Sequence, residues 1–195
     1  MLSHKKSLDI LKKTNALLEG LFILSSGLHS SKYIQCAKLL SFPHLAEKIC
    51  KSLASKIKKN FNKIDLILAP AMGGIIIGYE IGKILRKETI FCERVSGKFA
   101  LRRGFRIKKG SKVLIVEDVI TTGKSSMECV KLIKKSKAKL IGFASIINRS
   151  NKKNLKIKRK IISQIEIDIP SYKKNNLPND LKLLAITVPG SRFIK

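Results

Sequence analysis

Apolar and polar residues follow one another along this chain in blocks that predict strands and helices in alternation. Four short apolar runs, each bounded by polar or turn-forming residues, have the length and the branched side chains of buried strands. They cover residues 66–69, 89–92, 113–116 and 140–147. Helical spacing of apolar residues predicts helices at residues 7–18, 43–59 and 73–85, and a further helix that buries Met127, Val130 and Ile133.

This order of elements predicts an α/β fold, with a parallel-sheet core flanked by helices. Strands that alternate with helices of this length form right-handed βαβ units, and ligands bind such sheets at the carboxyl ends of the strands. Two short strands are expected at residues 21–37, around a turn at 25–31, and two later ones at 161–169 and 183–188. We expect these four strands to form a small β-containing lid, or hood, and the polar, very basic residues 148–160 to form a loop.

The length of 195 residues suits a single domain with a substantial core, and no internal repeat or interdomain linker interrupts it. We therefore expect one domain over residues 1–195, with the hood formed by about residues 20–40 and 160–192.

The segment at residues 113–126 carries the most informative chemistry. Its apolar strand runs directly into Glu117 and Asp118, and a Thr-Thr-Gly turn then leads into a helix. Hydroxyl groups and unpaired backbone N–H groups at a helix N-terminus favour a phosphate, and the two acids can accept hydrogen bonds from vicinal sugar hydroxyls. The pattern indicates a ribose 5-phosphate site, made of Glu117, Asp118, Val119, Ile120, Thr121, Thr122, Gly123, Lys124 and Ser125.

Other interpretations of the glycine-containing motifs in this chain are weaker. A Walker A loop needs a glycine five residues before Gly123, and that position is Asp118. A dinucleotide-binding fingerprint needs a spacing that Gly73, Gly74 and Gly78 do not have. A buried strand that ends in a solvated acidic turn is the remaining alternative.

The segment resembles the phosphoribosyl pyrophosphate (PRPP) motif of the type I phosphoribosyltransferases. Other parts of the chain narrow the resemblance to the orotate phosphoribosyltransferases, and together they span about residues 7–192. They are similar to that family's N-terminal substrate-covering segment, pyrophosphate-side loop, mobile loop, orotate-binding arginine and usual ending, at residues 20–30, 68–74, 93–105, 146–149 and 189–192 respectively.

The resemblance implies transfer of the 5-phosphoribosyl group from PRPP to orotate, giving orotidine 5′-phosphate and pyrophosphate in the de novo synthesis of UMP. Mg²⁺ is the implied cofactor, because it binds through phosphates and keeps waters, so that few protein ligands are needed. Glu117 and Asp118 would hold the ribose hydroxyls, directly or through that metal. Adjacent strand residues point to opposite faces, so the two acids need not do the same job.

Arg149 is the expected partner of the orotate carboxylate, because a guanidinium binds a carboxylate through two hydrogen bonds, and Thr121 would add a backbone or hydroxyl contact. Without the resemblance, Arg149 is an ordinary surface residue. His29, on the turn of the hood, is either solvated or a substrate contact.

The cations of residues 94–105 have the composition of a loop that closes over a leaving group. The resemblance assigns pyrophosphate contacts to Arg94 and Lys98, with Arg102 a weaker candidate, and implies a homodimer in which the loop serves the neighbouring subunit. The alternative is an ordinary basic hairpin.

Departures from better-known members of the family concern the contacts with pyrophosphate. This chain has Ser25 and Gly73 where many of them have lysine, and Ala100 where many have a loop histidine. Lys124 replaces a residue that is often small. The end of the loop at residues 101–105 and the turn at residues 70–74 instead resemble a distinct subgroup of the same family.

The formal net charge of +28 is the main unusual feature of the composition. Of the 41 basic residues, 33 are lysine, and they are spread over nearly every segment. Few arginines or aromatic residues are present to read or stack bases, so no specific nucleic-acid partner is expected. A lysine-rich genome explains most of this charge, and steering of anionic substrates explains a smaller part.

The remaining composition predicts a cytoplasmic protein. No apolar run is long enough to span a membrane, and the start of the chain does not resemble a signal peptide. The four cysteines are scattered, which indicates reduced thiols and argues against a zinc site.

Two other functions stay open. A phosphoribosyltransferase for a purine or uracil would lack the hood segment at 24–30 and an arginine at position 149. A PRPP-sensing regulator of nucleic acid would bind RNA or DNA with a steep salt dependence and would not turn over substrate.

Overall fold

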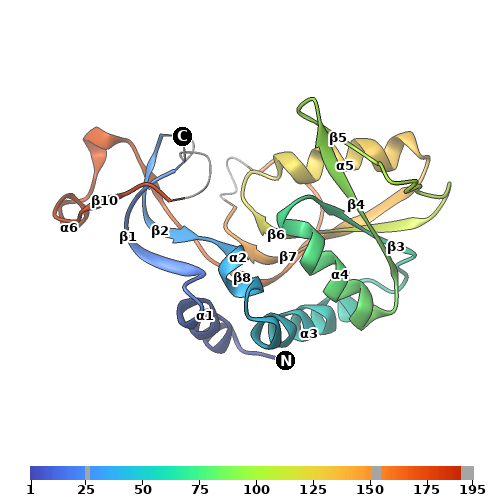
Figure 1. Ribbon diagram of the computed structural model, residues 1–195, viewed down its shortest axis with the longest axis horizontal. Helices are drawn as coiled ribbons and strands as arrows, with labels where there is room; N and C mark the ends of the chain where they lie inside the picture. The colour runs from blue at the N-terminus through green and yellow to red at the C-terminus, as the bar shows by residue number, and fades with distance from the viewer. Residues whose placement is uncertain (25–26, 151–154, 190–195) are drawn as a thin grey trace.

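The computed structural model describes residues 1–24, 27–150 and 155–189, which form two β-sheets with helices packed around them (Figure 1). The larger sheet has six strands in the order β5-β4-β3-β6-β7-β8. All neighbours in it are parallel except β5, which is antiparallel to β4. The strands are β3 (Leu66–Pro70), β4 (Glu88–Val95), β5 (Lys98–Ala100), β6 (Lys112–Ile120), β7 (Lys139–Asn148) and β8 (Ile161–Glu166).

Helices cover both faces of this sheet, as the apolar pattern predicts. On one face α3 (Pro43–Asn60) and α4 (Gly73–Leu85) pack together, and α1 (His4–Lys13) lies against β8 (Figure 1). On the other face α5 (Lys124–Lys135) packs against β6 and β7. Each face has its own buried apolar cluster, so alternate residues of β6, such as Leu114 and Ile115, belong to different clusters.

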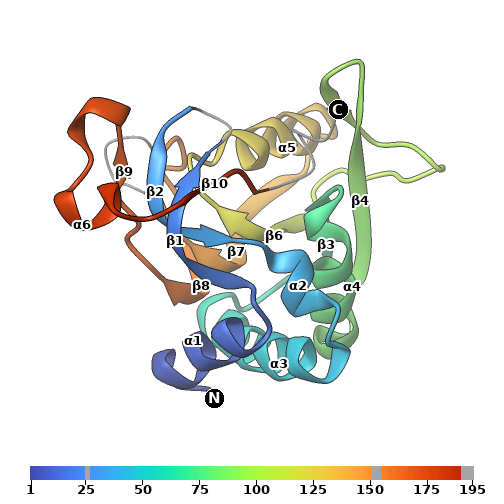
Figure 2. The ribbon, with the colours of Figure 1, turned by 60° about the vertical axis from the view of Figure 1, so that its left-hand side comes forward.

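The smaller sheet has four strands in the order β10-β1-β2-β9 and lies beside the larger one (Figures 1 and 2). Its long strands, β1 (Leu17–Ile23) and β2 (His29–Ile34), pair in antiparallel fashion with an irregularity between Glu19 and Phe22. Its outer strands β9 (Ser171–Tyr172) and β10 (Ile186–Thr187) come from the C-terminal part of the chain. A short 3₁₀ turn, η1 (Lys174–Asn176), and α6 (Asn179–Lys182) connect them.

Most predicted elements of the larger sheet are confirmed, and every strand is longer than its apolar run. The helix predicted at residues 7–18 is wrong at its C-terminal end. It ends at Lys13, Asn15 takes a left-handed conformation with φ of 54°, and Leu17 begins β1. Leucines at helical spacing also fit a strand, and here the pairing of Leu17 with Ile34 places Leu17 in a strand. The short helix α2 (Cys36–Leu40) was not predicted.

The assignment of residues 161–169 to the hood is wrong in its first part. β8 is the edge strand of the larger sheet, where Phe143 to Asn148 of β7 pair in parallel with Ile161 to Glu166. An apolar run carries no information about which sheet it joins, because burial on either sheet needs the same residues. Of the strand predicted at 183–188, only Ile186–Thr187 pairs, with β1. The predicted turn at Ser25 and Ser26 and the family-like ending at 190–192 lie outside the described residues.

Residues 94–105 contain more regular structure than their sequence indicates. β4 continues to Val95, and the chain turns at Ser96 and Gly97 and returns as β5. Arg94 pairs with Phe99 across this hairpin, which projects beyond the larger sheet (Figure 2). The alternative of a basic hairpin therefore describes residues 94–100.

Candidate active site

The turn between β6 and α5 is shaped by glycine and by packing beneath it. Gly123 has φ of 71°, and a Cβ atom there would lie 2.7 Å from Cγ1 of Ile157. The neighbouring Lys156 N–H donates to the Thr122 carbonyl at 2.9 Å. Residues 155–157, from the loop after β7, thus support the turn from below and leave no room for a side chain at Gly123.

The N-terminus of α5 is open to an anion. Gly123 is the N-cap residue, and no side chain of the described residues caps the helix. The first-turn N–H groups have no intrahelical acceptor, and the positive end of the helix dipole lies there. Thr121, Thr122 and Lys124 are exposed beside it, and the Lys124 N–H donates to the Thr122 hydroxyl at 3.4 Å. These groups suit a phosphate.

Glu117 lies on the α5 face of the sheet. It is 6% exposed, and its Oε1 accepts a short hydrogen bond from the Ser126 hydroxyl of α5. Burial raises the pKa of Glu117 to about 7, against the smaller lowering effect of the Ser126 hydrogen bond. Glu117 therefore changes its charge near neutral pH, where it can either donate a proton or accept hydrogen bonds.

Asp118 lies on the opposite face, beside α4. Its Oδ1 accepts from the Val119 N–H at 2.8 Å, and its Oδ2 lies only 2.2 Å from where a Cβ on Gly73 would be. Burial raises the pKa of this carboxyl as well. The prediction that the two acids face opposite ways is confirmed.

Gly73 is a site feature that the sequence did not connect with Asp118. It is the first residue of α4, at the carboxyl end of the neighbouring strand β3. A lysine at this position, as in many orotate enzymes, would require the Asp118 carboxylate to move. The small residue keeps the acid against the start of α4.

Arg149 follows β7 and lies at the same end of the sheet. Its backbone N–H donates to the Ile120 carbonyl at 2.9 Å, which fixes it next to the end of β6. Burial lowers the pKa of its guanidinium, while Tyr33 of β2 raises it. Within the described part of the chain the guanidinium has no hydrogen bond or ion pair. Arg149 is therefore half-buried at this end of the larger sheet and within electrostatic range of Tyr33 of the smaller sheet, a residue that the sequence did not single out.

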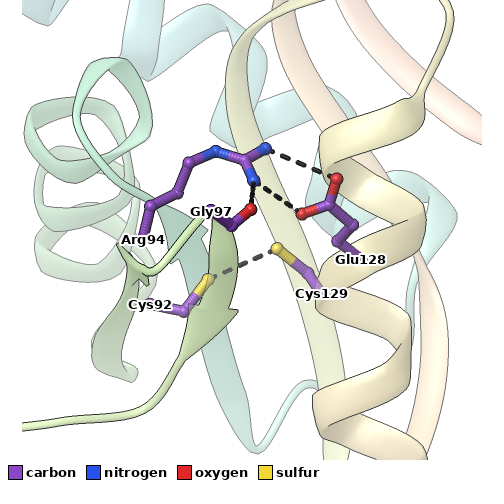
Figure 3. Close-up of polar contacts among 5 residues, drawn as sticks. All are labelled: Cys92, Arg94, Gly97, Glu128 and Cys129. Carbon is purple, nitrogen blue, oxygen red and sulfur yellow. Dashed lines mark hydrogen bonds and ion pairs between the residues drawn. The ribbon is translucent and has the colours of Figure 1, made fainter.

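The predicted loop cations lie apart from this cluster. Arg94 donates to Glu128 of α5 at 2.9 Å and to the Gly97 carbonyl at 2.6 Å (Figure 3). Its guanidinium lies 4.1 Å from the centre of the Phe99 ring. The ion pair with Glu128 attaches the hairpin to the side of α5. Lys98 and Arg102 are exposed, and neither takes part in an ion pair with any described residue.

Cysteine and histidine chemistry adds no metal centre to the described residues. No group of three or more His, Cys, Asp or Glu side chains there has the geometry to hold a metal ion. All four cysteines are free and buried, and the Sγ atoms of Cys92 and Cys129 are 3.4 Å apart (Figure 3). Their contact and burial raise the pKa of Cys129, so this thiol stays protonated.

His29 is a buried residue of the smaller sheet. It is 4% exposed in β2, and its Nδ1 is buried without a hydrogen bond to any described residue. The interpretation of His29 as a solvated turn residue is therefore wrong.

No helix among the described residues is long and apolar enough to cross a membrane.

Comparison with known proteins agrees with this geometry. Residues 42–175 match the phosphoribosyl transferase domain family. Among solved structures, orotate phosphoribosyltransferase from Aeropyrum pernix is similar with a TM-score of 0.69 at 20% identity, covering 82% of this chain and 92% of that one. Adenine phosphoribosyltransferase from Saccharomyces cerevisiae gives 0.65 at 19% identity, covering 80% and 99%. At such identities the likeness establishes the fold alone.

Sequence similarity identifies the branch of the family to which the chain belongs. The orotate phosphoribosyltransferase of Parvibaculum lavamentivorans is 44% identical over 194 residues, covering 99% of this chain and all of that protein. The chain belongs to the phosphoribosyl transferase domain family and, within it, to the orotate phosphoribosyltransferases.

Proposed function

We propose that this protein transfers the 5-phosphoribosyl group from PRPP to orotate, giving orotidine 5′-phosphate and pyrophosphate. One observation carries the proposal: Arg149, half-buried and unpaired among the described residues, lies beside the end of β6, whose acids lead into the open N-terminus of α5. A phosphate site, a site for sugar hydroxyls and a carboxylate-binding arginine thus lie at one end of the sheet. The 44% identity to an orotate phosphoribosyltransferase supports orotate as the base.

The turn and the acids would bind the two ends of the ribose phosphate. The 5-phosphate would accept hydrogen bonds from the first-turn N–H groups of α5 and from the hydroxyls of Thr121 and Thr122. The ribose hydroxyls would donate to Asp118, and to Glu117 in its ionised form. Displacement of pyrophosphate leaves positive charge on the ribose, and two carboxylates next to the ring stabilise that charge.

Arg149 would hold the orotate carboxylate through paired hydrogen bonds, and Thr121 would contact the base from the end of β6. We propose that residues 1–195 form one domain, whose four-stranded sheet is the hood that covers the base with Tyr33 and excludes water. Partial burial strengthens the pairing of a guanidinium with a bound carboxylate, because less of it remains in water.

Magnesium fits the residues present. The described site offers two carboxylates and no third ligand, which suits an ion that keeps waters and binds mainly through substrate phosphates. Asp118 and Glu117 would be its nearest protein ligands. When bound, Mg²⁺ would neutralise the charge of the departing pyrophosphate.

We further propose that Arg94, Lys98 and Arg102 contact pyrophosphate when the hairpin moves away from α5, and that the protein acts as a homodimer. Exposed apolar side chains support a dimer: on the outer side of α4 and just before it, Met72, Ile76 and Tyr79 are 83%, 56% and 66% exposed. The four buried, free cysteines support a reducing compartment such as the cytoplasm.

The test is the loss of orotate absorbance with PRPP and Mg²⁺, compared with adenine and uracil as bases. Arg149→Ala and Asp118→Asn should each lower kcat/KM about 100-fold or more, since they remove charged contacts at a site that excludes water. Arg106→Ala and Asp9→Asn are matched controls at exposed positions and should retain activity. Turnover of adenine or uracil in preference to orotate would contradict the proposal, and so would full activity of the Arg149 variant.

A further inference from the structure

The strands of the larger sheet begin at an edge that is lined with lysine. Lys108 and Lys109 precede β6, Lys134 and Lys135 end α5, and Lys137 and Lys139 lie just before and at the start of β7. All six side chains are exposed. We call these six residues the basic rim.

Backbone hydrogen bonds hold the segments before β6 and before β7 side by side. The Gly110 N–H donates to the Lys137 carbonyl at 3.0 Å, and the Lys139 N–H donates to the Ser111 carbonyl at 2.8 Å. The rim is therefore one surface, and neighbouring strand starts in it are about 5 Å apart.

The charge of the rim is not neutralised by the protein. None of the six lysines takes part in an ion pair with a described residue. Residues 106–112 and 134–139 contain no acid, and the neighbouring Asp65 carboxylate accepts the backbone N–H of Lys112. Like charges that crowd together repel one another, and a bound polyanion relieves that repulsion.

Steering of substrates does not account for this surface. The candidate active site lies at the carboxyl ends of the strands, and the rim lies at their amino ends. The nine residues of β6 separate the two by about 25 Å. At physiological salt the field of a charge decays over about 8 Å, so the rim contributes little at the active site.

We infer that the basic rim binds the phosphate backbone of double-stranded nucleic acid without reading its bases. A duplex carries a charge about every 1.7 Å, a density that a row of lysines can match. Residues 106–112 and 134–139 contain no aromatic residue, and single-strand binding relies on aromatic stacking. Arg106 is the one arginine in these two segments, so the forked guanidinium groups that read guanine are nearly absent.

The test compares two variants of equal charge. The rim variant changes the six rim lysines to glutamine, and the control variant changes Lys5, Lys6, Lys13, Lys38, Lys173 and Lys174, which are exposed and outside the rim. Each variant lowers the formal net charge by six, from +28 to +22. Binding of a short labelled duplex is followed by fluorescence anisotropy between about 50 and 200 mM salt.

We expect the rim variant to bind about 100-fold more weakly at low salt, with a salt slope reduced by about five, while the control variant stays near wild type. The double variant Lys108→Gln with Lys109→Gln should reduce the slope by about two and leaves most of the surface intact if the larger variant fails to fold. Orotate turnover should be unchanged in all of them, which also reports folding.

Three results would overturn the inference. Equal weakening in both variants would mean that net charge alone attracts the duplex. Displacement by an acidic polypeptide as effective as by duplex, at equal charge concentration, would indicate a protein partner. No binding by the wild-type protein at about 50 mM salt would mean that the rim is only a solvated surface.

Discussion

The β6–α5 turn and the β4–β5 hairpin both contain a glycine at positive φ and charged side chains, but they are held in place differently. At the turn, Gly123 lies against Ile157, and Glu117 is buried against α5. At the hairpin, nothing lies within 4 Å of a Cβ built on Gly97, and the Arg94 and Glu128 side chains are 43% and 21% exposed.

The difference indicates which part of the site is preorganised and which can move. Packing in a core leaves the turn one arrangement, so a phosphate meets donors that are already in position. An exposed ion pair contributes only about 0–1 kcal/mol, so the hairpin can leave α5 at small cost. Motion of a closing loop limits the rate of many enzymes. Three tests, each with a control variant, probe the contrast.

The largest expected effect is that of Gly123→Ala compared with Gly97→Ala. Both replace a glycine at φ between 71° and 78°, which costs about 1 kcal/mol for an alanine. Only Gly123→Ala also forces a Cβ against Ile157, which adds about 1–3 kcal/mol and displaces the phosphate-binding turn. We expect it to lose most PRPP turnover and about 2–4 kcal/mol of unfolding free energy, measured by urea denaturation.

Gly97→Ala serves as the control, and we expect it to lose only about 1 kcal/mol of unfolding free energy. Equal losses in the two variants would mean that φ alone matters and that residues 155–157 do not support the turn. A third variant, Ile157→Ala in the Gly123→Ala background, separates these causes, because it removes the clash and should restore part of the activity.

The same contrast explains how much the sequence predicted. Glu117, Asp118 and the turn that follows were predicted at their observed places, because a strand, an acid pair and a helix start are all local signals. Their opposite faces also follow from strand alternation. The contact of Asp118 with Gly73 and of Gly123 with Ile157 joins residues tens of positions apart, and no local pattern encodes it.

Where predictions were wrong, contacts between distant parts of the chain determined the structure that each segment adopts. Leu17 joins β1 because it pairs with Ile34, and β8 joins the larger sheet because β7 offers it a parallel edge. The hairpin at Val95 has exposed residues on both strands, so its sequence shows no alternation. His29 lies in a buried row of the hood although histidines on turns are usually solvated.

The second test concerns the buried acid of the turn. Glu117 has a pKa of about 7 in the folded protein against 4.5 as its ordinary value, so folding favours its protonated form. As pH rises from about 4.5 to about 7, this acid lowers the unfolding free energy, by at most about 3 kcal/mol. Glu117→Gln keeps an acceptor for Ser126 and should remove that loss.

The variant should therefore be more stable than wild type above pH 7, by about 2–3 kcal/mol, and equal to it near pH 4.5. Thermal unfolding of the ligand-free protein across this range measures the difference, and Glu166→Gln, at an exposed position, should show none. In wild type, KM for PRPP should rise as pH falls through 7, because the protonated acid is a poorer acceptor for the ribose hydroxyls. A difference in stability that does not depend on pH would contradict the assignment.

The smallest expected effect is at the hairpin. Glu128→Gln removes the charge that pairs with Arg94 across 2.9 Å, but the stacking of Arg94 on Phe99 and its bond to Gly97 remain. The loss of unfolding free energy should stay near 0.5 kcal/mol, and salt should abolish it. Glu80→Gln, which breaks the exposed pair with Lys83 far from the hairpin, is the matched control.

Kinetic constants should reveal more about the role of Glu128 than the unfolding free energy does. Release of Arg94 lowers the cost of moving the hairpin toward pyrophosphate, so Glu128→Gln should lower KM for PRPP or raise kcat by about twofold, the factor that 0.5 kcal/mol allows. Proteolysis at the Ser96–Gly97 turn should also become faster, since the attached state protects it. An unchanged KM together with faster proteolysis would show that the ion pair holds the hairpin but that its opening does not limit the reaction. Slower turnover would instead mean that Glu128 positions Arg94 for catalysis, and the hairpin would then belong with the preorganised turn rather than in contrast to it.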